Sequence, residues 1–161
     1  MKTWTITLNK KDIFYDIDAI THDYAMASRE GVTARERDAM SSDAEEQADH
    51  DVLTRFADNR VSSLVHHMSF AVAATTDTTS DDTLSSGDYT ITLSVLDRCE
   101  DKVLDSITKL MHEYVVKGSL KDWYDLLGVS RGDLYSARLA EIEKLIIGLL
   151  LSRSIPAVRT S

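Results

Sequence analysis

Two short segments alternate between apolar and hydroxyl side chains. Residues 3–9 read TWTITLN and residues 88–96 read DYTITLSVL, so from Trp4 to Leu8 and from Tyr89 to Val95 every second position is apolar and the positions between are Thr or Ser. This period of two is typical of a β-strand with one buried face. We predict two strands that pair with each other and bury one apolar face against the rest of the domain, formed by Trp4, Ile6, Leu8, Tyr89, Ile91 and Leu93.

Two helices are predicted between these strands. Apolar residues at helical spacing over 11–28 follow Asn9, which suits the N-cap position of a helix. Farther on, Ser42 with Glu45 three positions later forms a capping box. It opens an apolar stripe that continues at three- and four-residue steps from Val52 to Val72. The intervening residues 29–41 show little periodicity and are predicted as a loop with some helical content.

Two further helices are predicted after the second strand. Asp97 can cap a helix that runs to about residue 127, either continuous or kinked at Gly118, and Gly128 suits the left-handed position that ends it. The last helix opens at Ser130 or Asp133 and ends before Pro156. Residues 75–88 are rich in Thr, Ser and Asp and are predicted as an exposed, mobile loop.

Together these elements predict a mainly α fold with a small β element. Four amphipathic helices can bury their apolar faces by packing against one another. We therefore expect a four-helix bundle plus a two-stranded β-sheet over residues 1–152. Residues 153–161 are expected to form an extended C-terminal tail. At 161 residues the chain is long enough for one domain and short for two.

Charge and hydropathy exclude several classes of function. A net charge of -9 argues against a nucleic-acid-binding site, because such a site uses a basic surface to neutralise phosphates. The longest apolar stretch, 145–151, is too short to cross a membrane, and the N-terminal segment lacks the apolar core of a secretory signal. The single cysteine, Cys99, rules out an internal disulfide. We therefore expect no membrane contact and a cytoplasmic site of synthesis.

The polar residues with catalytic potential do not assemble into a recognisable motif. His66 and His67 are adjacent on a helix and point about 100° apart, so they cannot chelate one metal as an i, i+4 pair does. Cys99 and His112 are separated by almost four helical turns, about 20 Å, which excludes direct pairing within one helix. His50, among acidic neighbours, is ordinary for an exposed helix. We expect no catalytic residue, no metal and no cofactor.

The two strands leave the sheet with open edges. A two-stranded sheet is only marginally stable, and its unpaired edges are either protected or used for strand addition by another chain. Charges that could protect the edges lie only at the strand ends, at Lys2, Lys10 and Asp88. We expect a strand-edge interface, formed by the strands of Trp4, Ile6, Leu8, Tyr89, Ile91 and Leu93, or the tail to engage a neighbouring subunit.

Two long segments of the chain resemble a known family of proteins. The opening MKTWTITLNKKDIFYDIDAIT and the later GDYTITLSVLDRCEDKVLDSITKLMHEYVVKGSLKDWY are similar to small virion proteins of tailed phages that infect gut Bacteroidetes, including crAss-like phages. The resemblance implies a head-to-tail connector (adaptor or ring) protein: a helical bundle with a small β element that assembles as about twelve copies below the portal. Its partners would be the portal and neighbouring ring or tail proteins.

The resemblance also suggests roles for two segments. The tail would bind the portal or the ring through Arg153, Ile155, Pro156, Val158 and Arg159. The acidic loop, with Asp77, Asp81 and Asp82, would face the DNA channel or the next ring. A negative subunit suits a tunnel through which double-stranded DNA slides without adhering. The expected location is the virion, after assembly in the host cytoplasm.

Two other classes of function remain open. A cytoplasmic adaptor or regulatory module could bind one protein partner through the Thr-rich strand edge. An enzyme could use a site without a sequence motif, with His66, His67 or Asp49 as candidates, because groups assembled in space leave no local trace in the sequence.

Overall fold

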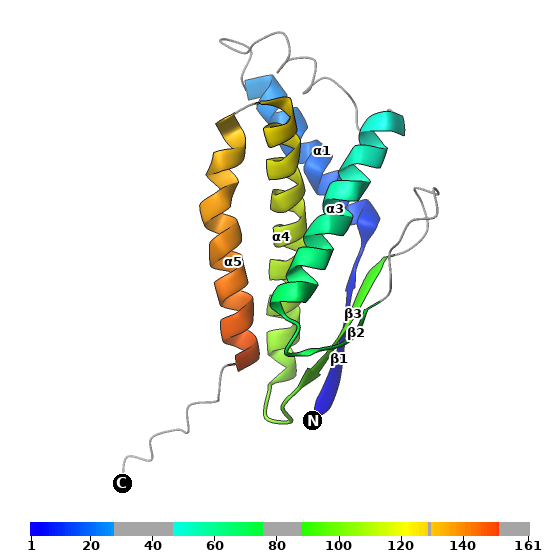
Figure 1. Cartoon of the computed structure of the whole chain (residues 1–161), viewed down its shortest axis with the longest axis vertical. Helices are drawn as coiled ribbons and strands as arrows, with labels where there is room; N and C mark the ends of the chain where they lie inside the picture. The colour runs from blue at the N-terminus through cyan, green and yellow to red at the C-terminus, as the bar shows by residue number, and fades with distance from the viewer. Residues whose placement is uncertain (28–46, 76–87, 129, 152–161) are drawn as a thin grey trace.

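The computed structural model of the chain describes residues 1–27, 47–75, 88–128 and 130–151 (Figure 1). This part of the chain is mainly helical and includes a small antiparallel sheet, which confirms the predicted mainly α fold with a small β element. The helices are α1 (Lys10–Ala27), α3 (Gln47–His67), α4 (Asp101–Leu127) and α5 (Asp133–Leu151), and a short 3-10 helix η1 (Ser130–Gly132) precedes α5. The strands are β1 (Lys2–Leu8), β2 (Val72–Thr75) and β3 (Tyr89–Val95).

Several predicted features lie outside the described residues. They are the loop at 29–41, the capping box of Ser42 and Glu45, the acidic loop with Asp77, Asp81 and Asp82, and the tail 153–161 with Arg153, Ile155, Pro156, Val158 and Arg159. The predictions for these segments stay predictions.

The two predicted strands pair with each other. β1 is antiparallel to β3, with Trp4 opposite Leu93, Ile6 opposite Ile91 and Leu8 opposite Tyr89. All six side chains are buried in the core, as the alternating pattern predicts. The apolar face of the sheet packs on the helices, and α4 contacts β1 directly.

The sheet has three strands, so the prediction of two is wrong. β2 pairs antiparallel with β3 on the side opposite to β1, in the order β1-β3-β2. The apolar stripe of the second predicted helix was carried too far, because α3 ends at His67 and the chain then turns. The N–H groups of Ala71 and Val72 both donate to the Met68 carbonyl, at 2.8 and 3.1 Å. Met68 and Ala71 stay buried in this turn, which explains why the apolar spacing continued past the helix.

The predicted start of α1 is confirmed, and that of α4 is wrong. The Asn9 side chain accepts hydrogen bonds from the N–H groups of Lys11 and Asp12, at 2.9 and 3.2 Å, and so caps α1. Asp97 does not cap α4, which begins at Asp101 after Glu100. At the other end Gly128 has a φ of 69°, the left-handed geometry predicted for it.

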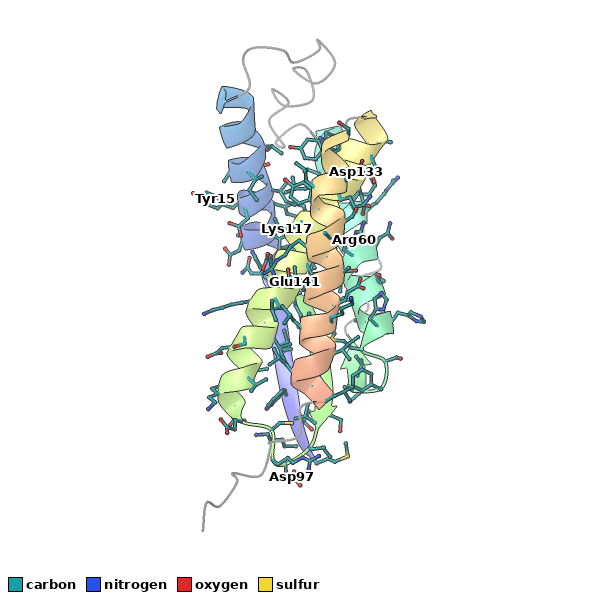
Figure 2. All side chains as sticks on the ribbon, turned by 90° about the vertical axis from the view of Figure 1, so that its left-hand side faces the viewer. Tyr15, Arg60, Asp97, Lys117, Asp133 and Glu141 are labelled. Carbon is teal, nitrogen blue, oxygen red and sulfur yellow. The ribbon has the colours of Figure 1, made fainter. Side chains whose placement is uncertain are left out.

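Helix α4 lies at the centre of the fold. It contacts α1, α3, α5 and β1, whereas α5 packs mainly on α4 (Figures 1 and 2). Across the α4–α5 interface, the Arg138 guanidinium donates to both oxygens of Glu113, at 2.8 and 2.9 Å. This pairing, helped by Lys117, lowers the pKa of Glu113 to about 2. No described helix has the length and apolar character needed to cross a membrane.

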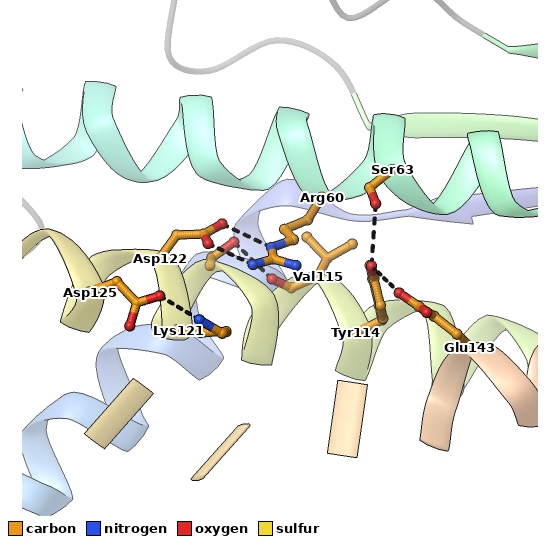
Figure 3. A network of polar contacts seen from close by, with 9 residues as sticks. Arg60, Ser63, Tyr114, Val115, Lys121, Asp122, Asp125 and Glu143 are labelled. Atoms are coloured by element: carbon orange, nitrogen blue, oxygen red, sulfur yellow. Dashed lines mark hydrogen bonds and ion pairs between the residues drawn. The ribbon is translucent and has the colours of Figure 1, made fainter. Parts of the chain in front are cut away.

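Helix α4 is continuous through Gly118, which resolves the alternative that the sequence left open. Gly118 is fully packed against the Arg60 side chain of α3, and a Cβ at this position would lie 2.5 Å from the Arg60 Cδ. Arg60 crosses α4 here and binds Asp122 through two hydrogen bonds of 2.8 and 2.6 Å (Figure 3). The Ser119 hydroxyl donates to the Val115 carbonyl, which keeps this buried polar group paired. Glycine is therefore needed for the approach of Arg60 and not for a kink.

We predict that Gly118→Ala lowers the free energy of unfolding when residue 60 is Arg and raises it when residue 60 is Ala. In the native sequence the new methyl group displaces Arg60 from Asp122, and the free energy of unfolding should fall by about 1–2 kcal/mol. In an Arg60→Ala background the same change should raise it by about 0.5–1 kcal/mol, the usual gain of Ala over Gly in a helix. Urea unfolding of the four chains measures both values. An equal effect in the two backgrounds would contradict the role given to Gly118.

Candidate functional site

One face of the sheet carries a regular array of hydroxyl groups. Thr3, Thr5 and Thr7 of β1 are exposed and lie opposite three half-buried hydroxyl residues of β3, namely Ser94, Thr92 and Thr90. Strand geometry separates neighbouring hydroxyl side chains by about 4.8 Å across the strands and about 6.7 Å along them. None of these six side chains is charged, although 28% of the chain is. We call these six residues the hydroxyl face.

Among the residues that the structure describes, the backbone of β1 is paired on one side only. The Ser94 N–H donates to the Ala71 carbonyl at 2.7 Å, so the backbone groups of Ser94 point toward β2 and away from β1. In an antiparallel ladder such directions alternate along the strand. Because Thr3 lies opposite Ser94, the N–H and C=O groups of Thr3, Thr5 and Thr7 must point outward. Within the described ranges no backbone group of another element bonds to them, and we call them the open edge.

The open edge lacks the usual protective features. Natural edge strands are protected by proline, by a bulge, or by charges within the strand. β1 has no proline and pairs with β3 without a bulge, and its one charged residue, Lys2, is at its end. The strand is seven residues long, enough for another strand to pair along it.

Polar contacts fix the first residues of β1 to α4. The Lys2 ammonium donates to Asp101 at 2.7 Å, and the Trp4 indole N–H donates to the same carboxylate at 3.2 Å. The hydrogen bond from Lys2, followed by that from Trp4, lowers the pKa of Asp101. The N-terminal amine of Met1 binds Asp97 at 3.0 Å.

The other end of the sheet is fixed to α3 through Tyr89. Its hydroxyl donates to Asp58 at 2.5 Å, and the Lys10 ammonium lies 4.7 Å from the centre of its ring. Burial, followed by the hydrogen bond to Asp58, raises the pKa of Tyr89. These contacts hold the hydroxyl face and the open edge on a rigid support.

The structure changes the residues assigned to the strand-edge interface. β3 is the central strand, so the edge assignment of Tyr89, Ile91 and Leu93 is wrong. The side chains of Trp4, Ile6 and Leu8 lie in the core and cannot contact a partner. What β1 presents at its edge is the backbone of Thr3, Thr5 and Thr7. The alternating pattern of the sequence already distinguishes these three threonines from the apolar residues between them, which are buried.

Two of the histidines that the sequence singled out, His67 and His112, pair with acidic residues of other helices. His112 lies 2.6 Å from Asp16 of α1, a pair that joins two helices far apart in the sequence. His67 lies 3.4 Å from Glu143 of α5. In the residues that the structure describes, no group of three His, Cys, Asp or Glu side chains is placed to hold a metal ion.

A polar line between three helices was missed at the level of sequence. The Tyr114 hydroxyl donates to Glu143 at 2.8 Å and lies 3.4 Å from the Ser63 hydroxyl (Figure 3). These residues come from α4, α5 and α3. Spacing along one helix does not show which polar residues of the other helices it meets.

Comparisons with protein-family models, with curated proteins and with solved structures find no match.

We predict that the Tyr89 hydroxyl contributes to the attachment of the sheet. Tyr89→Phe leaves the Asp58 carboxylate without this donor and should lower the free energy of unfolding by about 1–3 kcal/mol. Tyr15→Phe is the matched control, because Tyr15 is 73% exposed and its change should stay within about 0.5 kcal/mol. Chemical denaturation measures both. Equal stability of the two variants would show that the Tyr89–Asp58 bond does not stabilise the fold.

Proposed function

We propose that this chain is a structural subunit of a virion ring, in the head-to-tail connector below the portal of a tailed phage. About twelve copies would surround the DNA channel. The observation that carries the proposal is the open edge of β1, an unprotected strand edge beside an uncharged hydroxyl face. A surface of this kind is suited to contact with another polypeptide chain. The chain would act by assembly and not as an enzyme.

Exposed apolar side chains of α5 support the same proposal. Leu134 is 71% exposed, and Leu145 and Leu151 are also exposed. They lie on a helix that packs on α4 on one side only, so a neighbouring subunit would find apolar surface there. A ring requires two different surfaces on each subunit, because contacts between neighbours are head-to-tail.

The proposal assigns roles to the segments that the sequence singled out. The four helices would form the bundle of the connector subunit, with Asp77, Asp81 and Asp82 facing the channel or the next ring. Arg153, Ile155, Pro156, Val158 and Arg159 would act in the extended tail as the contact with the portal or the ring. The net charge of -9 would keep DNA from adhering to the channel wall.

The open edge also supports a second candidate, a cytoplasmic adaptor that binds one protein partner by strand addition. The two candidates differ in number of copies and in location. An adaptor would bind its partner in equal amounts and would be absent from particles.

The decisive experiment locates the chain in particles and counts it. Phage particles from a culture that produces the chain are purified by density, and the copy number is measured against the major virion proteins by quantitative mass spectrometry. We expect the chain to co-purify in about twelve copies, or a small multiple of this, and micrographs to show it as a ring. A stable monomer or dimer that is absent from every particle would contradict the proposal.

A further inference from the structure

We propose that residues 152–161 of one copy bind as an added strand to the open edge of β1 in the next copy. This inference rests on the proposed function, because it specifies the contact between neighbouring ring subunits. It identifies the occupant of the open edge as a segment of this chain. Three observations support it: the position where the described chain ends, the length of the segment, and the placement of its single proline.

The segment starts at the end of the molecule where β1 begins. Figure 1 shows the last turn of α5 and the N-terminus at the same end, and Figure 2 shows Asp97 at this end and Asp133 at the opposite one. Ten residues follow Leu151. Fully extended they span about 33 Å, compared with about 23 Å for the seven residues of β1. The segment is long enough to cover the whole open edge.

A neighbouring copy is a better source of the strand than the same copy. α5 packs mainly on α4, and among the described residues it has no extensive contact with β1, so a segment that leaves α5 starts at a distance from the open edge of its own copy. The segment of a neighbouring copy does not have to cover this distance. Such a contact joins the C-terminal segment of one copy to the open edge of the next. Contacts between two different surfaces are head-to-tail, and head-to-tail contacts can close a ring.

The proline fixes which side of the segment can face β1. Pro156 has no N–H, so in an added strand it must lie among the residues that point away from β1. Ile155, Ala157 and Arg159 then direct their backbone groups toward the open edge. Directly opposite residues share a face of the sheet, so these three side chains would extend the hydroxyl face. Val158 would lie on the other face, beside the apolar side of β1.

The open edge can accept such a strand without internal change. Thr3, Thr5 and Thr7 already direct their backbone groups outward, and their side chains leave the edge uncharged. A strand that bonds to all three would form up to six hydrogen bonds. One strand pair buries less than the approximately 1,200 Å² typical of stable complexes, so the contact should be weak between two copies and strong only in a closed ring.

The test uses two full-length variants that block opposite sides of the contact. Thr5→Pro removes an outward N–H of the open edge and leaves the bonds between β1 and β3 in place. Ala157→Pro removes an N–H on the side of the segment that faces β1. By light scattering over a concentration series, the native chain should increase in mass, and each variant alone should stay monomeric. An equal mixture should form complexes of two chains and no larger species, because one variant keeps its segment and the other keeps its edge.

Two control variants match these changes. Val158→Pro removes an N–H that would point away from β1, so self-association should persist. Thr92→Lys places a charge on the hydroxyl face of the central strand, where it leaves the open edge intact, so self-association should again persist. Circular dichroism confirms that each variant is folded.

A peptide competition keeps the test valid even if a proline variant fails to fold. A synthetic peptide with the sequence of residues 152–161 should inhibit self-association of the native chain. The same peptide N-methylated at Ala157 should not inhibit, whereas one methylated at Val158 should.

Several outcomes would overturn the inference. A native chain that is monomeric at every concentration would do so, as would equal behaviour of the two methylated peptides. Loss of association in Thr5→Pro but not in Ala157→Pro would show that β1 pairs with β1 of a second copy. Loss in Thr92→Lys alone would identify the hydroxyl face as the contact.

Failure of this contact is distinguishable from failure of the proposed function. A chain that is present in particles as a ring but does not associate through the segment would retain the function and lose the contact. A chain that associates as described but is absent from particles would retain the contact and lose the virion role.

Discussion

The antiparallel register of β1 and β3 is the constraint on which the rest of the structure depends. It joins the first residues of the chain to a segment that follows two helices, and it places Ile6 directly opposite Ile91 in the core. A slip of one residue would turn the apolar side chains of β1 to solvent and bury its threonines. The bonds from Lys2 and Trp4 to Asp101 hold β1 in this register. The same register determines that Thr3, Thr5 and Thr7 form the open edge.

Polar contacts specify how the helices pack around α4. Apolar contacts alone are compatible with several rotations of a helix about its own axis. The two hydrogen bonds between Arg60 and Asp122 form only when α3 and α4 turn these two residues toward each other. Gly118 allows Arg60 to cross α4, and Glu113 with Arg138 fixes α5 in a similar way. These pairs are partly buried, so removing one partner leaves a poorly solvated charge and destabilises the packing of the two helices.

The alternating and helical patterns predicted the strands near 3–9 and 88–96, the cap at Asn9 and the end of α4 at Gly128, because each depends on local spacing. They could not predict β2, since VAAT has no alternation and becomes a strand only beside β3. Because β2 was not predicted, β3 was taken for an edge strand, whereas β2 pairs with its second side and makes it the central strand. The start of α4 was predicted too early, because the chain turns after Val95, with the Cys99 N–H donating to the Leu96 carbonyl, and the helix begins only at Asp101. Spacing along one helix also could not show that Gly118 faces Arg60.

The proposed assembly requires an unpaired strand edge, and within the described residues β1 presents one. Native-state hydrogen exchange of the unassembled chain, followed by NMR at the amides of β1, tests this claim most directly. The amides of Trp4, Ile6 and Leu8 face β3 and should exchange slowly, whereas those of Thr3, Thr5 and Thr7 should exchange close to the rate of exposed amides. Protection of the three threonine amides equal to that of their neighbours would show that the edge is already occupied and would contradict the account.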